Sequence, residues 1–269
     1  MKYQTGLWSS APVTVLDPDL IPTTCWSIRP RPPFFAFSLE VQILLAVEYH
    51  KLLDVSDIEE SLVLTIDPAL TSEASHPAQR DSFTKAYRYL LDVGVPSGNV
   101  IFMGGSAGGG LCILSALEAK KEGLPQPAGS ILISPWMDMS LRSFQGGNAL
   151  VETDYVATAN TSVPMFSRMF LGQSKYKGDS PEVNPLYRTP ESLRNLNPQL
   201  ILVGAAEFTL QESKDWAALC RKAGVEHELV VEWGQLHVYA LGSRFLDSEV
   251  RRRTDEKVVG WMSRHLSES

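Results

Sequence analysis

Short apolar runs alternate with longer stretches in which apolar residues recur at helical spacing along most of this chain. Apolar runs bounded by turn residues predict buried strands at 61–67, 99–105, 130–136, 198–207 and 227–234. Helical spacing predicts helices at 38–53, 76–94, 107–123, 210–224 and 247–266. Two segments follow neither pattern: 1–36, which is rich in proline, and 141–195, which proline and glycine interrupt.

Strands that alternate with helices predict an α/β fold with a mostly parallel central sheet and helices on both faces. We expect one domain over residues 1–269, with 1–36 as an atypical N-terminal segment and 141–195 as an insertion that forms a partial helical cap. Active sites in such sheets lie off the carboxyl ends of the strands. Ser106, Glu207 and His237 all follow predicted strands at those ends.

The charge balance is acidic, with a formal net charge of −7 at pH 7 and a pI of about 5.3. Nucleic acid or an anionic membrane surface would favour a basic face, so neither is expected as a main partner. The sequence shows no apolar run of transmembrane length and no signal-peptide pattern. Its three cysteines lie far apart, which favours reduced thiols over a disulfide framework or a zinc site and predicts a cytoplasmic protein.

The stretch FMGGSAGGG at 102–110 places one serine among five glycines, between a predicted strand and a predicted helix. It matches G-x-S-x-G, but neither the dinucleotide-binding G-x-G-x-x-G pattern nor a phosphate-binding loop that ends in Gly-Lys-Ser/Thr. In G-x-S-x-G the serine occupies a tight strand-to-helix turn that exposes its hydroxyl. We therefore interpret Ser106 as a nucleophile; the alternative is that the glycines only let the helix and strand pack closely.

A serine nucleophile needs a base, and the base needs an acid to orient it, in the chain order serine, acid, histidine for this kind of fold. His237 lies in a loop after the last predicted strand, where its imidazole can face the serine. Glu207 directly ends the strand at 198–207 and is favoured as the acid. Glu212 and Asp215, on the following helix, remain alternatives and otherwise belong to a solvated face. No H-x-x-x-H spacing or carboxylate cluster suggests a metal site.

These residues and their surroundings resemble the hormone-sensitive-lipase-like branch of the α/β-hydrolases, the arylacetamide-deacetylase type of carboxylesterase. The resemblance spans roughly residues 60–269. GGSAGGG is similar to the family's G-D-S-A-G-G elbow, HPAQRDSFTKAYRYLL to its P-A-x-x-x-D helix, ISPWMDMS to S-P-W-x-D-x-S, and EVNPLY to an N-P loop. LILVGAAEFTLQES and GQLHVYAL resemble the segments that carry the acid and the base.

The resemblance implies an α/β-hydrolase fold and a serine carboxylic-ester hydrolase that uses no cofactor. Its substrates would be small hydrophobic esters of short-to-medium acyl chains or of acetate, cleaved through an acyl-Ser106 intermediate. Glu207 and His237 would be the acid and the base, and Ala107 and Gly105 the oxyanion residues.

The family's H-G-G-G motif, which supplies oxyanion donors, is missing. FFAFS at 34–38 resembles the segment directly after that motif, yet Pro30, Pro32 and Pro33 precede it, and proline has no N–H to donate. Replacement donors would be Arg31 or the amides of 34–36. This departure supports two alternatives: a catalytically impaired binding protein on the same fold, and a truncated or mis-spliced inactive product.

Substrate-contacting residues are less sharply indicated by the sequence. Trp136 and Met137 follow a predicted strand and would border an acyl pocket, or else belong to the core. Phe34 and Tyr155 are further candidates, the latter within the expected cap at 141–195.

Overall fold

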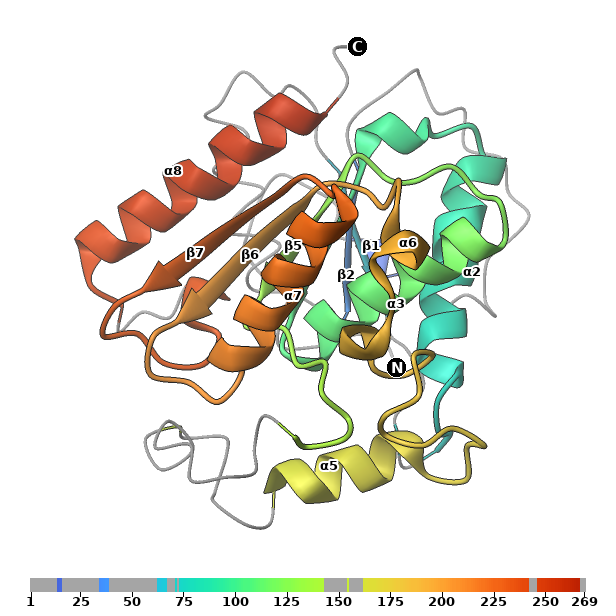
Figure 1. The fold of residues 1–269 in the computed structure, drawn as a ribbon. Coiled ribbons are helices and arrows are strands. Elements are labelled where there is room, and N and C mark those ends of the chain that lie inside the picture. Colours follow the sequence, from blue (N-terminus) through green and yellow to red (C-terminus); the bar gives the residue numbers. More distant parts are fainter. Residues whose placement is uncertain are drawn as a thin grey trace, which may run out of the picture.

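The computed structural model of the chain describes the strand segments 14–15, 34–38 and 62–66 and residues 71, 73–142, 154, 162–241 and 246–266. The strands described there form one parallel sheet of order β1-β3-β2-β4-β5-β6-β7 (Figure 1). They are β1 (Thr14–Val15), β2 (Phe34–Ser38), β3 (Leu62–Ile66), β4 (Val100–Gly105), β5 (Gly129–Ile133), β6 (Gln199–Gly204) and β7 (His227–Glu232). The α-helices are α2 (Ala78–Asp92), α3 (Ala107–Lys121), α5 (Ser162–Leu171), α6 (Pro190–Leu193), α7 (Leu210–Ala223) and α8 (Ser248–His265).

The central strands β4, β5 and β6 are buried throughout, and successive side chains of a strand point to opposite faces of the sheet. In β4, Val100 and Phe102 belong to the apolar cluster shared with α2, α3 and α7, whereas Ile101 and Met103 belong to the cluster shared with α8. Figure 1 shows the same arrangement: α8 lies on one side of the sheet, and α2, α3 and α7 lie on the opposite side. A continuous apolar run is therefore what a central parallel strand requires.

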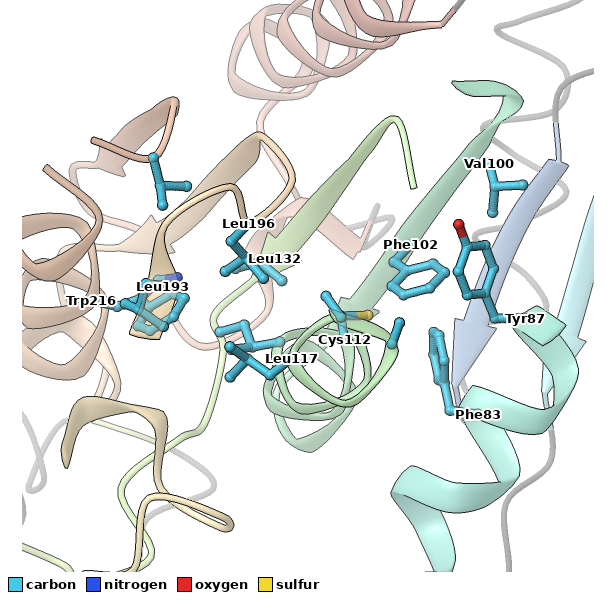
Figure 2. Packing of buried hydrophobic residues seen from close by; sticks show 14 of the residues in the cluster. Phe83, Tyr87, Val100, Phe102, Cys112, Leu117, Leu132, Leu193, Leu196 and Trp216 are labelled. Atoms are coloured by element: carbon cyan, nitrogen blue, oxygen red, sulfur yellow. The ribbon is translucent and has the colours of Figure 1, made fainter. Parts of the chain in front are cut away.

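Aromatic contacts anchor α2 to the sheet. The Phe102 ring packs edge-on against Phe83 and Tyr87 of α2, with ring centroids 4.8 and 4.9 Å apart (Figure 2). The same cluster continues across the sheet to Trp216 of α7, which is fully buried. These contacts hold α2 and α7 against the sheet, together with α3, which begins at the carboxyl end of β4.

Most of the predicted elements are present, with shifts of a few residues at their ends. The strand predicted at 130–136 ends at Ile133, because Ser134 has a φ of 47° and Pro135 has no N–H for a ladder. The helix predicted at 38–53 lies, after Ser38, outside the described residues.

The apolar run FFAFS, which the pattern did not predict as a strand, forms β2 in the middle of the sheet, between β3 and β4. Four of its five residues are apolar, as is usual for a strand that has a parallel neighbour on each side.

The described part of 141–195 is more helical than its irregular pattern predicts. It contains α5 and short helical turns at Pro185–Tyr187 and Pro190–Leu193. Val163 and Phe170 of α5 pack in one cluster with Trp136, which follows β5, and Phe208, which follows β6. This helix therefore lies over the loops at the carboxyl edge of the sheet (Figure 1). No helix among the described residues combines the length and apolarity needed to cross a membrane.

Candidate active site

Ser106 lies in the turn between β4 and α3, with a φ of 51°. Positive φ is uncommon for a residue other than glycine and is a feature of strained turns at functional sites. The turn is tight enough that a side chain at position 104 would collide with the backbone of Gly108. The Ser106 N–H donates to the Ile133 carbonyl at 2.8 Å, which ties the turn to β5. The glycines thus permit the close approach that leaves the serine at the tip.

His237 reaches Ser106 from the loop after β7. Its Nε2 lies 2.9 Å from the Ser106 Oγ, and its side chain is almost completely buried. The loop passes so close to the end of β6 that a side chain at Gly204 would collide with the Gln235 carbonyl. The imidazole is therefore held within hydrogen-bond reach of the nucleophile by close backbone packing.

Glu207 completes the line of side chains from the loop after β6. One of its carboxylate oxygens lies 2.8 Å from His237 Nδ1, and the other accepts the Gly204 N–H at 2.9 Å. The carboxyl group is fully buried. Because both oxygens are engaged, the carboxylate holds one orientation and fixes the tautomer of His237 that leaves Nε2 free to accept a proton.

The two alternative acids have backbone and side-chain partners of their own. Glu212 is buried, where a solvated face was expected, and one of its oxygens accepts the N–H groups of Met137 and Asp138 at 2.7 and 2.9 Å. Asp215 is exposed and accepts from Gln211 on its own helix. Glu207 is the candidate acid that lies within hydrogen-bond distance of His237 Nδ1, at 2.8 Å.

The order Ser106, His237, Glu207 can move a proton away from a serine hydroxyl. The imidazole accepts the proton as the serine oxygen attacks, and the buried carboxylate stabilises the imidazolium that forms. The described cysteines offer no rival nucleophile, since burial raises the pKa of Cys220 to about 12 and also raises that of Cys112.

Asp154 is a member of this site that the sequence pattern did not indicate. It is buried, and its carboxylate accepts the Phe208 N–H at 3.0 Å, next to Glu207 in the chain. The ligand atoms of Asp154, Glu207 and His237 lie within 4.8 Å of one another, close enough to surround a cation. The direct contact between Glu207 and His237 favours a hydrogen-bonded set over a metal site. A single aspartate 53 residues before Glu207 carries no local signal of this role.

An apolar pocket that is partly open to solvent begins next to the nucleophile. Its wall includes Ala107 at the start of α3, the two candidates Trp136 and Met137, and Phe170 of α5. Ala107 is exposed, and as the first residue of a helix its N–H has no acceptor within that helix. Tyr155, the further candidate, lies outside the described residues.

Phe34 does not belong to this site. It pairs with Val100 at the amino end of β4. Ser106 follows Gly105 at the carboxyl end of the same strand, about 16 Å away. The backbone of 34–36 is paired in the sheet between β3 and β4, so its amides are not the replacement oxyanion donors that were considered.

The position of β2 also bears on the missing glycine motif. In α/β-hydrolases the second oxyanion donor comes from the loop that follows a strand. β2 neighbours the nucleophile strand β4, and its carboxyl end is Ser38. The prolines at 30, 32 and 33 precede the opposite end, so they do not occupy the loop in question. The residues after Ser38 lie outside the described part of the chain.

Comparison with known proteins identifies the family to which this fold belongs. A family model described as alpha/beta hydrolase fold matches residues 49–241. An esterase of Acinetobacter venetianus is 28% identical over 64% of this chain and 55% of its own length. An acetyl-hydrolase of Streptomyces hygroscopicus is 28% identical over 69% of this chain and 60% of its own length. This chain thus spans little more than half the length of these relatives.

Among solved structures, a hormone-sensitive lipase from a metagenome library superposes with a TM-score of 0.74 at 26% identity. That match covers 86% of this chain and 77% of the other. The likeness therefore extends over most of this chain. The chain belongs to the alpha/beta hydrolase fold family and, within it, is similar to the hormone-sensitive-lipase-like esterases.

Proposed function

We propose that this protein is a serine carboxylic-ester hydrolase in which Ser106 is the nucleophile, His237 the general base and Glu207 the acid that orients it. The observation that carries the proposal is the continuous line from Ser106 Oγ through the imidazole to the buried carboxylate, with contacts of 2.9 and 2.8 Å. The names of its relatives, an esterase and an acetyl-hydrolase, support the same reaction class and do not favour a non-catalytic binding protein.

In this reaction the Ser106 oxygen attacks the ester carbonyl while its proton passes to His237 Nε2. The tetrahedral intermediate then collapses, His237 returns the proton to the departing alcohol oxygen, and the acyl group remains on Ser106. A water molecule next attacks the acyl carbonyl and gives its proton to the same nitrogen. Collapse of the second intermediate releases the carboxylic acid and restores the Ser106 hydroxyl.

Ala107 is the oxyanion donor that this proposal assigns, because the donor next to the nucleophile is the N–H of the following residue. Gly105 precedes the nucleophile and is buried as the last residue of β4, so no donor role is assigned to it. The second donor would come from the loop that follows β2.

The substrate class is inferred from the pocket beside Ala107. It is apolar, as pockets for hydrophobic ligands are. An acyl chain that enters it meets Trp136, Met137 and Phe170 rather than charged groups. These features support acetyl or other short-to-medium acyl esters of a small hydrophobic alcohol as substrates. Cys112 and Cys220, both buried free thiols, support a reducing compartment such as the cytoplasm as the place of action.

Hydrolysis of p-nitrophenyl acetate and butyrate by the wild type and Ser106→Ala tests the function. Ser115→Ala is the matched control, because Ser115 is a buried serine within α3 that takes no part in the proposed chemistry. We expect the wild type and Ser115→Ala to be active and Ser106→Ala to fall to the background rate. A folded wild type no faster than Ser106→Ala would overturn the proposal.

A further inference from the structure

The short turn after β5, residues 133–136, contacts both the nucleophile and the histidine loop. The Ile133 carbonyl accepts the Ser106 N–H at 2.8 Å, and the Trp136 N–H donates to the Ser106 carbonyl at 2.9 Å. Both backbone polar groups of the nucleophile are therefore held by this turn. Between these two residues stands Ser134, which is fully buried.

The Ser134 hydroxyl accepts the N–H of Val238 at 2.9 Å. Val238 directly follows His237, so this hydrogen bond fixes the backbone on which the imidazole is carried. The Ser134 N–H in turn donates to the Leu202 carbonyl of β6 at 2.7 Å, which ties the backbone that carries the hydroxyl to the sheet. One residue thus links the histidine loop to the turn that holds the nucleophile.

The backbone conformations at this contact are unusual. Ser134 has a φ of 47° and Val238 a φ of 54°. A β-branched residue such as valine is rarely found at positive φ, and surrounding contacts must maintain such a conformation. The hydrogen bond between the two residues is a contact of that kind.

We propose that Ser134 is a positioning residue for the esterase reaction: its hydroxyl holds the Val238 amide and thereby sets the distance between His237 Nε2 and Ser106 Oγ. The inference rests on the proposed function. Ser134 touches neither substrate nor the transferred proton, so it acts only through the histidine loop. The misplacement of a base by about 1 Å can lower a rate by about a hundredfold.

Two substitutions separate the hydroxyl from the backbone conformation. Ser134→Ala removes the acceptor and keeps a side chain at the same φ. Ser134→Gly removes the acceptor too, but glycine tolerates positive φ better than any other residue. If the hydroxyl matters, both variants lose activity; if Ser134 serves only to adopt the turn, Ser134→Gly is as active as the wild type.

We expect both variants to show kcat for p-nitrophenyl butyrate lowered about 10- to 100-fold with KM within about threefold of the wild type. The Val238 amide should also exchange with deuterium faster in both. Ser115→Ala, which deletes a buried serine hydroxyl elsewhere, should change neither readout. Thermal unfolding of every variant shows whether a loss of kcat reflects loss of folded protein, and Ser134→Gly remains informative where Ser134→Ala folds poorly.

Failure of this inference is distinguishable from failure of the proposed function. If Ser134→Ala and Ser134→Gly both keep kcat within about threefold of the wild type, the positioning role is overturned. The esterase function still stands in that case, provided that Ser106→Ala falls to the background rate. A wild type no faster than Ser106→Ala would overturn the esterase function and, with it, any role for Ser134 in that reaction.

Discussion

Glu207→Gln is the substitution that examines the buried carboxylate most directly. Glutamine has nearly the same shape, so the change removes the charge without opening a cavity. In the wild type the two oxygens accept from Gly204 N–H at 2.9 Å and from His237 Nδ1 at 2.8 Å. Glutamine has one acceptor oxygen and one NH₂ donor, so it can accept only one of these two hydrogen bonds.

Either orientation of the amide disturbs the site. If the oxygen faces His237, the NH₂ group opposes the Gly204 N–H, and a buried donor is left unsatisfied at a cost of about 1–3 kcal/mol. If the NH₂ group faces His237 instead, Nδ1 becomes the acceptor and the proton moves to Nε2, so the imidazole cannot take the proton of Ser106. The corresponding change in a Ser-His-Asp hydrolase lowers kcat about 10⁴-fold, and we expect a loss of about 10³- to 10⁴-fold here. A loss of that size equals about 4–5.5 kcal/mol of transition-state stabilisation.

Steady-state hydrolysis of p-nitrophenyl butyrate measures kcat and KM, and chemical denaturation measures the free energy of unfolding. Glu212→Gln is the informative comparison, because Glu212 is also a buried carboxylate but accepts the backbone N–H groups of Met137 and Asp138. It should lose far less kcat than Glu207→Gln, and Asp215→Asn on the exposed face should match the wild type. A folded Glu207→Gln that keeps more than about a tenth of the wild-type kcat would refute the assignment of the acid.

Three further predictions concern the surroundings of the site. Burial, and then the nearby Arg80, lower the pKa of His76 from 6.5 to about 4, so the unfolded chain binds its proton more readily between those values. The free energy of unfolding is therefore unaffected by this histidine above pH 6.5 and falls by up to about 3 kcal/mol as the pH drops toward 4. Urea unfolding of His76→Phe should show a weaker pH dependence over that range than urea unfolding of the wild type. Asp154→Ala leaves the buried Phe208 N–H without its acceptor and should lower the free energy of unfolding by about 1–3 kcal/mol and reduce kcat, whereas an unchanged kcat would separate Asp154 from the acid loop. Phe170→Ala enlarges the acyl pocket, so the ratio of kcat/KM for p-nitrophenyl hexanoate to that for the acetate should rise about tenfold or more, and a constant ratio would place the acyl chain elsewhere.

The elements that flank the site could be predicted because their patterns are local. The apolar runs before Ser106 and Glu207 end in glycine or small residues, and each is followed by residues at helical spacing. The chain order serine, acid, histidine then selects the residues that the structure brings into contact. Local pattern also failed where its signal was ambiguous: β2 follows two prolines, and this masked a strand in the middle of the sheet.

Residues whose function depends on tertiary contacts gave no such signal. Glu212 has the sequence context of a surface residue, yet it is buried because the loop after β5 brings two backbone N–H groups to it. Ser134 resembles any serine at the end of a strand, and only the approach of the Val238 amide gives its hydroxyl a partner. Asp154 similarly acquires its place from Phe208, which is remote in sequence. Such contacts arise from how loops fold back over the sheet, which periodicity does not encode.

The oxyanion site illustrates how the direction of a strand decides a functional assignment. As a motif, FFAFS stands after three prolines where the family has glycines, which suggests that the donors are lost. In the sheet, β2 runs parallel to β4, so Ser38 lies at the same edge as Ser106 and the prolines precede the other edge. Backbone amides can stabilise an oxyanion at Ser106 only from the carboxyl edge. A second donor would therefore have to approach Ser106 from the edge of the sheet at which β2 ends with Ser38, and Pro33 directly precedes the opposite end of that strand.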